Sequence, residues 1–316
     1  MRLARRRFIR ASAAAALLSA LAPLRSLAQP APTARLVLLG TKGGPSLRDV
    51  LRVPSSNALI IGERTYIIDA GYGVSLRLTE KKIALPSIRA IYVTHHHSDH
   101  NLELGSLLYN MWANSATRPI EVYGPDGVDP LVRGYLEANR FDIETRIADE
   151  GRPDLRKMVD VHTYHEGRVM ENDDVRVSAL RNQHPPIVES YALKFEIKGG
   201  KTIVFSGDTA YFPPLAAFAR DCDYLVHEVM YGPGLDRLVQ RNPAAKTLMD
   251  HLRAAHTLTE DVGRIASAAR AKNLVLTHLV PADDPAITED DWTRGVRASY
   301  SGRIIVAKDL LEVPLT

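Results

Sequence analysis

Four histidines and one aspartate are crowded into a seven-residue segment, THHHSDH, at positions 94–100. The segment directly follows the apolar run Ala-Ile-Tyr-Val, which has the composition of a buried strand. His95 and His97 lie two positions apart, so an extended backbone directs both rings to the same side, and the turn that follows supplies Asp99 and His100. Imidazole and carboxylate groups at this density are typical ligands of zinc or a similar divalent ion. A solvated polar loop is the alternative, and the adjoining buried strand argues against it.

The elements that must position these side chains alternate between short β-branched runs and amphipathic stretches, which favours layered sheets covered by helices. Strands are expected at 35–39, 58–61, 65–68, 90–94, 120–123, 175–180, 191–197, 202–206, 224–227, 274–277 and 303–307. Helices are expected at 103–113, 126–139, 213–219, 246–254, 259–271 and 287–298. Thr257 and Glu260 have the spacing of a capping box for the helix at 259–271.

Two charged segments have no clear assignment from their pattern. Residues 140–173 lack periodicity, so we expect an insertion or long loop that either borders a site or is a solvated excursion. Residues 231–255 are expected either to cover a site as a lid or to form ordinary surface.

Five motifs, in order along the chain, resemble the signature of the metallo-β-lactamase fold family. The run from His95 to His100 is similar to its HxHxDH motif. Four further motifs match in sequence: IIDAG with the structural aspartate Asp69, NQHP with His184, SGDT with Asp208 and LTHL with His278.

This resemblance implies an α/β (α+β) architecture, a four-layered αββα sandwich, with two divalent metal ions, expected to be zinc, at one edge of the paired sheets. It implies one site of His95, His97 and His184, a second of Asp99, His100 and His278, and Asp208 bridging both. The metals would lower the pKa of bound water, and the resulting bridging hydroxide would attack phosphorus, sulfur or a carbonyl carbon. Asp99 is expected to orient or deprotonate that water.

Within the family, the chain is most similar to the ribonuclease Z-like branch. The loop GTKGGP at 40–45 resembles the opening glycine loop of that branch, and His227-Glu228 and His256-Thr257 resemble its His-Glu and His-Ser-Thr motifs. The resemblance gives His256 the role of proton donor to the leaving group, and a histidine ahead of a helix can titrate near neutrality. A surface histidine beside a helix cap is the alternative. His227 and Glu228 are expected either to orient His256 or to make local hydrogen bonds at a strand end.

The chain also departs from that branch. It has no long Gly/Pro-rich arm of the kind that grips tRNA, and NLELG after His100 replaces the usual glycine-leucine-proline run. Without the six arginines of residues 1–28, the formal net charge of +3 becomes −3. A mildly acidic domain lacks the basic footprint of a long nucleic-acid binder. These features argue against a nucleic-acid partner and favour a small-molecule substrate.

Residues 1–28 have the layout of an export signal. A basic start and an alanine-rich stretch precede Ser26-Leu27-Ala28, which resembles a cleavage site. The arginine pair before Phe8 and Ile9 resembles a twin-arginine signal, which implies a periplasmic protein exported in its folded state. A basic amphipathic helix is the alternative. The hydrolase domain is then expected at 32–316, with no apolar run of the roughly 18 to 20 residues that a membrane span needs.

The sequence therefore predicts an exported dinuclear metal-dependent hydrolase of a phosphodiester or related ester. Hydrolysis of a carboxylic ester, lactone, sulfate ester or β-lactam is the first alternative. A non-catalytic metal- or ligand-binding protein is the second, and the complete ligand set argues against it. A homodimer is an open expectation, because dimers are common among similar proteins.

Several other side chains with chemical potential receive weaker expectations. Cys222 lies between two aspartates, which disfavour a thiolate nucleophile. Solvent exposure or local hydrogen bonds are expected for the histidines outside the motifs, His162, His165 and His251. Tyr211 and Tyr231 are expected either to line the substrate cleft or to pack at its rim.

Overall fold

The computed structural model describes residues 33–48 and 51–315, and the expected export signal lies outside them. Within this part of the chain, two seven-stranded sheets have the orders β14-β1-β2-β3-β4-β5-β6 and β13-β12-β11-β10-β9-β8-β7. The strands of the first sheet are β1 (Ala34–Gly40), β2 (Ser56–Ile61), β3 (Arg64–Ala70), β4 (Ile88–Tyr92), β5 (Ile120–Gly124), β6 (Val159–Thr163) and β14 (Leu311–Pro314). Those of the second are β7 (Gly167–Glu171), β8 (Val175–Arg181), β9 (Tyr191–Ile197), β10 (Thr202–Phe205), β11 (Tyr224–Met230), β12 (Asn273–Val280) and β13 (Arg303–Val306).

The two sheets pack face to face because their strands are apolar on both sides. Along β1, Val37 and Leu39 join a cluster under the helices, whereas Leu36 and Leu38 join the cluster between the sheets. Side chains alternate between faces along a strand, so a strand buried on both faces becomes a continuous apolar run. Phe195 of β9 lies in the same inter-sheet cluster, so residues of both sheets share this core.

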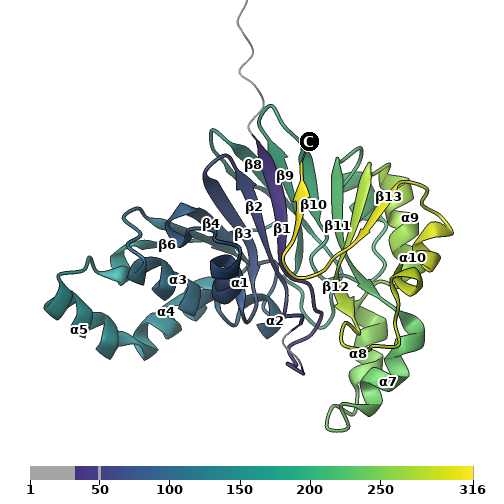
Figure 1. The fold of residues 1–316 in the computed structure, drawn as a ribbon, viewed down its shortest axis with the longest axis horizontal. Coiled ribbons are helices and arrows are strands. Elements are labelled where there is room, and N and C mark those ends of the chain that lie inside the picture. Colours follow the sequence, from purple (N-terminus) through teal and green to yellow (C-terminus); the bar gives the residue numbers. More distant parts are fainter. Residues whose placement is uncertain (1–32, 49–50, 316) are drawn as a thin grey trace, which may run out of the picture. The chain divides into compact units, whose positions relative to one another are not determined.

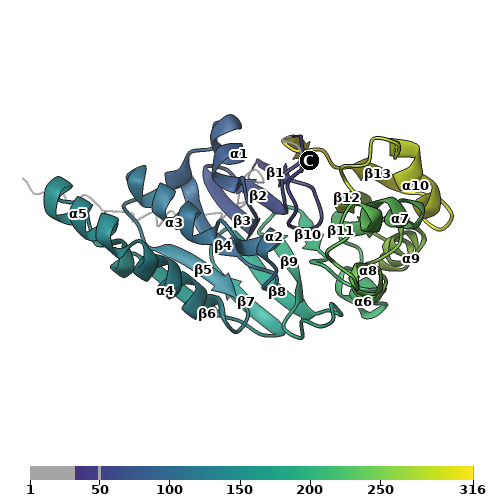
Figure 2. The ribbon, with the colours of Figure 1, turned by 90° about the horizontal axis from the view of Figure 1, so that it is seen from below.

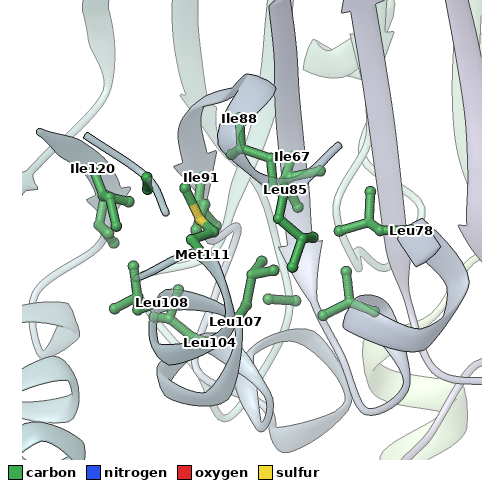
Figure 3. Close-up of a cluster of buried hydrophobic side chains, with 14 of the residues drawn as sticks. Ile67, Leu78, Leu85, Ile88, Ile91, Leu104, Leu107, Leu108, Met111 and Ile120 are labelled. Atoms are coloured by element: carbon green, nitrogen blue, oxygen red, sulfur yellow. The ribbon is translucent and has the colours of Figure 1, made fainter. Parts of the chain in front are cut away.

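Helices cover the outer face of each sheet (Figure 2). The α-helices are α1 (Val74–Glu80), α2 (Ser98–Asn101), α3 (Leu104–Ala113), α4 (Val128–Ala138), α5 (Arg140–Glu150), α6 (Pro214–Phe218), α7 (Leu235–Gln240), α8 (Leu248–Ala255), α9 (Thr259–Ala269) and α10 (Glu289–Arg297). Figure 3 shows Leu104, Leu107 and Leu108 of α3 directed toward Ile91 of β4. On the second sheet, α6, α9 and α10 bury their apolar faces in a matching cluster. The expected αββα sandwich is confirmed.

Parallel pairing brings the functional segments to one edge. Strands β3, β4 and β5 pair in parallel in the first sheet, as do β10, β11 and β12 in the second. Their carboxyl ends lie at the same edge, where α2 and α8 are also found (Figure 1). The loops that follow these strands therefore meet at one place.

Residues 140–173 differ from their expectation as a long loop. They form α5, β6, β7 and a short 3₁₀ helix at Leu155–Lys157, with Ile143 and Leu155 fully buried. The two strands lie at the edges of their sheets, and all their residues are exposed or only partly buried. Edge strands exposed in this way lack the hydrophobic run that indicates a strand in a sequence.

The expected capping box of α9 is also wrong. Helix α9 is preceded by Leu258, which makes no side-chain cap. The hydroxyl of Thr257 donates instead to the carbonyl oxygen of Thr209, at 2.6 Å, and thereby ties the helix approach to the loop after β10. The sequence reading also missed α1, α7 and β14, which are short. None of the described helices combines the length and the apolar character needed to cross a bilayer.

Candidate metal centre

The first ligand group consists of His95, His97, His184 and Asp208, whose ligand atoms all lie within 4.8 Å of one another. Nδ1 of His97 is 3.1 Å from Nε2 of His95 and 3.0 Å from Nε2 of His184. Oδ2 of Asp208 is 3.8 Å from the same nitrogen of His95 and 3.9 Å from that of His184. Side chains from the ends of β4, β8 and β10 thus converge on one point.

The second ligand group consists of Asp99, His100, Asp208 and His278. Nε2 of His278 lies 3.1 Å from Oδ2 of Asp208 and 3.3 Å from Oδ2 of Asp99. Nε2 of His100 lies 3.2 Å and 3.6 Å from the same two oxygens. Asp208 belongs to both groups, so the structure brings together all seven residues expected as metal ligands.

The backbone near these residues is shaped to aim them. His278 has a φ of 45°, in the left-handed region that is costly for a residue with a Cβ. The register between β11 and β12 shifts by a bulge between Glu228 and Val229, next to His278. A bulge re-aims side chains, which accounts for a strand residue that points to the sheet edge. The loop before β2 must also come close, since a Cβ on Gly43 would lie 2.8 Å from Cε1 of His278.

Hydrogen bonds to the far ring nitrogens orient the imidazoles. Nδ1 of His184 is 2.9 Å from the carbonyl oxygen of Ala255, so it carries the proton and leaves Nε2 for a ligand bond. Nδ1 of His100 is 2.7 Å from Oδ2 of Asp69. Oδ1 of Asp69 also accepts the backbone N–H of Thr94 at 2.8 Å, just before the histidine segment. Asp69 therefore has the structural position that the resemblance implied.

The donor set fits a divalent cation. Imidazole nitrogens that face one another at about 3 Å repel unless a proton or a cation lies between them. Nε2 of His100 is buried and makes no aligned hydrogen bond to any described residue. Nitrogen and carboxylate ligands in this arrangement suit zinc or another borderline ion.

The two groups differ in charge. Burial lowers the pKa of His95, His97 and His184, that of His97 to about 4, so these rings are neutral near pH 7. Burial also lowers the pKa of His100 and His278, but the Asp208 carboxylate outweighs it. The net pKa of both is raised, that of His278 to about 10. For Asp99 and Asp208, burial raises the carboxyl pKa, but His100 and His278 hold it well below its usual range.

His256 lies directly beside the second ligand group. Its ring stacks on that of His278, with ring centroids 5.5 Å apart. Nδ1 of His256 is 3.2 Å from Oε1 of Glu228. Burial lowers the pKa of His256, but the Glu228 carboxylate raises it more, so the net pKa lies above its usual value. The alternative of a surface histidine is excluded, because His256 is 8% exposed.

Glu228 is the residue that orients His256, and His227 is not. Oε1 of Glu228 also accepts the backbone N–H groups of Thr209 and Thr257, each at 3.1 Å. These two bonds fix the carboxylate between the loop after β10 and the approach to α9. The ring of His227 is fully buried, and its Nδ1 bonds the carbonyl oxygen of Glu228. Its role is local, within β11.

A cavity of about 340 Å³ opens onto both ligand groups. Its lining includes Lys42 and Gly44 of the opening loop, and the N–H of Gly44 donates to Oδ2 of Asp99 at 2.8 Å. Helices α7 and α8 supply further lining residues, among them Leu238 and His251. The segment 231–255 thus borders the site, whereas no residue of 140–173 lines this cavity.

His251 is the site residue that sequence reasoning missed. Its ring centroid lies 5.7 to 6.0 Å from those of His97, His184 and His256. The signal available in the sequence was its position on the predicted helix that leads directly to His256, which caps the end of α8.

The remaining candidates lie elsewhere. His162 contacts Glu121 at 2.6 Å and His165 lies near Glu189, away from both ligand groups. Tyr211 borders a separate cavity that touches His256, whereas the hydroxyl of Tyr231 bonds Asp291 of α10. Burial raises the pKa of the Cys222 thiol to about 12, so it is no nucleophile.

The chain is similar in sequence to a known protein family and to known enzymes. The family model described as Anti-Pycsar protein Apyc1 matches residues 34–237. A ribonuclease Z from Mycobacterium bovis (strain BCG / Pasteur 1173P2) is 30% identical over 281 residues, which cover 88% of this chain and 97% of the relative.

Two solved structures share the fold. The metallo-β-lactamase fold protein YhfI of Bacillus subtilis superposes with a TM-score of 0.65 at 20% identity, covering 89% of this chain and 99% of the other. The short form of human tRNase Z gives 0.63 at 20% identity with the same coverage. The ribonuclease name of the curated relative does not support our expectation that nucleic acid is no partner.

Proposed function

Because the chain belongs to the ribonuclease Z-like branch of the metallo-β-lactamase fold superfamily and is a metal-dependent hydrolase, we propose that it hydrolyses phosphodiesters at a dinuclear centre. The observation that carries this proposal is the pair of ligand groups that share Asp208, with His256 beside them. A phosphodiester is an anion whose charge grows during attack, and a strongly cationic site lowers that barrier most.

Two divalent ions, when bound by the seven ligand residues, would supply positive charge and a water molecule of lowered pKa. The ligands themselves carry two aspartates, Asp99 and Asp208, so two such ions leave the centre with a net positive charge. This excess suits an anionic ester better than a neutral carboxylic ester.

The chain's own groups then handle the protons. Asp99 is held by the N–H of Gly44 and is placed to orient a water molecule or accept its proton. His256, whose pKa is raised by the Glu228 carboxylate, donates a proton to the oxygen of the leaving group. Glu228 is a positioning residue, because two backbone N–H groups fix its carboxylate.

Zinc is the ion we propose, since both groups contain histidine and carboxylate. We also propose that residues 1–28 export the protein to the periplasm, on the arginine-rich and alanine-rich pattern of that segment.

The test is hydrolysis of a chromogenic panel by the purified protein, with and without a chelator. The panel holds a phosphodiester, a phosphomonoester, a sulfate ester, a carboxylic ester, a lactone, a β-lactam and a short RNA. Chelator-sensitive turnover of the phosphodiester is expected, and His256→Ala should lower kcat by about a hundredfold or more. His162→Ala is the matched control, because this histidine also pairs with a carboxylate but lies away from the centre. Preference for a neutral ester, with His256→Ala without effect, would contradict the proposal.

A further inference from the structure

The cavity beside the ligand groups is lined by metal ligands and also by aliphatic side chains. Six residues form what we call the apolar wall: Leu238, Ala245, Leu248, Leu252, Val280 and Ala282. They come from α7, the α7–α8 connection, α8 and the segment at the end of β12. The candidate metal ligands His97, Asp99, Asp208 and His278 line the same space of about 340 Å³.

The wall is part of a built structure. Leu252 and Val280 are buried in a small cluster of their own, against which the half-buried Leu238 and Leu248 pack. Leu238 and Leu248 thus contact the protein on one side and line the cavity on the other.

Hydrogen bonds and ion pairs fix the segments that carry the wall. Arg48, which follows the opening loop, donates to the carbonyl oxygen of Arg241 at 2.9 Å and to Oδ1 of Asn242 at 2.8 Å. Arg241 pairs with Asp283 at 3.1 Å, and Arg237 pairs with Asp284 at 2.6 Å. These contacts join Arg48 to α7 and its end, and α7 to the loop after β12.

The lining has no large aromatic ring and no guanidinium group. Among the described residues that line this cavity, none is a tyrosine, phenylalanine, tryptophan or arginine, and the imidazoles that line it, those of His97, His251, His256 and His278, pack on one another beside the ligand groups. Stacking on aromatic rings or guanidinium planes is the usual way to bind an unpaired base. The lysine at the cavity, Lys42, lies 3.4 Å from Oγ of Ser46 and 3.5 Å from the carbonyl oxygen of Gly44. The lining instead favours a small aliphatic group.

We propose that the substrate is a small phosphodiester whose non-leaving ester group is aliphatic and lies against the apolar wall. The inference rests on the proposed phosphodiesterase function and adds the class of substrate. In the reaction, water adds to phosphorus and the bond from phosphorus to the leaving oxygen breaks. The products are an alkyl phosphate and the alcohol of the leaving group, and the aliphatic ester bond stays intact.

The experiment varies the non-leaving group while the leaving group stays constant. Methyl, butyl and hexyl p-nitrophenyl phosphate all release p-nitrophenolate, so differences in kcat/KM report how the alkyl group binds. Each methylene that becomes fully buried is worth about fourfold. We expect hexyl to exceed methyl by at least about tenfold, since burial of the chain is partial. Thymidine 5′-(p-nitrophenyl phosphate) is expected to do no better than the methyl ester.

Variants of the apolar wall test whether it causes the preference for the longer alkyl group. Leu248→Asn should reduce the hexyl-to-methyl ratio of kcat/KM toward one, and Leu238→Ala should reduce it less. Leu131→Asn is the matched control, because Leu131 is on α4, is 38% exposed and does not line the cavity. This control should leave the ratio unchanged.

The outcomes separate the two proposals. If no phosphodiester in the series is hydrolysed while another ester class is, the proposed function fails. If all are hydrolysed but the rate does not depend on chain length, or if the thymidine ester is preferred, the function stands and the aliphatic substrate is wrong. A ratio that Leu131→Asn changes as much as Leu248→Asn does would also overturn the assignment of the wall.

Discussion

The two ligand groups share Asp208, yet their histidines differ in protonation. In the first group, three histidines face one another, and burial keeps them neutral. In the second, His100 and His278 each face the carboxylates of Asp99 and Asp208, which hold protons on the imidazoles. The first group is thus ready to bind a cation at neutral pH, whereas the second must release protons first. At one edge of the sheets, the first group therefore has neutral imidazoles that can bind a cation directly, and the second has imidazoles that carry protons.

The largest effect is expected from the residue that both groups share. Asp208→Ala removes a ligand from each group and leaves His278 and His100 without their main counter-charge. We expect bound metal to fall for both groups and the hydrolysis rate to drop by at least about a thousandfold. Metal content by mass spectrometry of the purified variant, together with kcat, measures this. Loss of one equivalent of metal while the other stays tightly bound would show that Asp208 serves one group alone.

Substitution of Asp69, which bonds His100 of the second group, should weaken metal binding by the second group more than by the first. Asp69→Asn keeps a side chain that tolerates the φ of 63° but removes the charge that faces Nδ1 of His100. Loss of such an outer partner typically costs about 10- to 100-fold in metal affinity. Competition with a chromophoric chelator should show the weakening in one binding step. An equal weakening of both steps would mean that Asp69 supports the whole edge through Thr94.

The pH dependence of metal binding should differ between the groups. Because the pKa of His278 is raised to about 10 in the metal-free protein, its proton must leave when the cation binds. Affinity for the second group should therefore rise with pH between 7 and 9, by up to about tenfold per pH unit for each proton displaced. Affinity for the first group should be nearly constant there, because the pKa of His97 is about 4. Titrations at several pH values would refute this if both binding steps rose with the same slope.

The smallest effect is expected at His251, which lines the cavity and packs near two histidines of the first group. His251→Ala removes a ring that packs near His97 and His184 but leaves every ligand in place. We expect about a two- to tenfold fall in kcat/KM with unchanged metal content, since the variant loosens the packing of a ligand. The conservative variant His251→Gln should recover part of the activity. A loss of metal would instead make His251 a ligand.

The ligands could be predicted because their signals are local. Each candidate ligand lies near the end of a strand that the sequence predicts, and the order of the motifs matches a known family. The expected strand at 191–197 has the observed bounds of β9, and that at 120–123 falls one residue short of β5. Buried strands of this kind can be predicted from their short apolar runs. Strands β6 and β7 lie at the sheet edges and contain only exposed or partly buried residues, so the sequence of 140–173 lacks the apolar run that would indicate them.

The sequence by itself indicated the fold class and the candidate site residues, the seven expected ligands and His256, which the structure brings together. Each was indicated by residue type near a strand end or a helix start. Tertiary structure decided which neighbours act on them. Glu228 and not His227 orients His256, since adjacent residues of β11 point to opposite faces and only the packing shows which face meets α9. His251 and the apolar wall became part of the site when α7 and α8 folded against the end of β12. Such contacts join residues that are distant in the chain, such as Leu238 and Val280, and no local pattern in a single sequence encodes them.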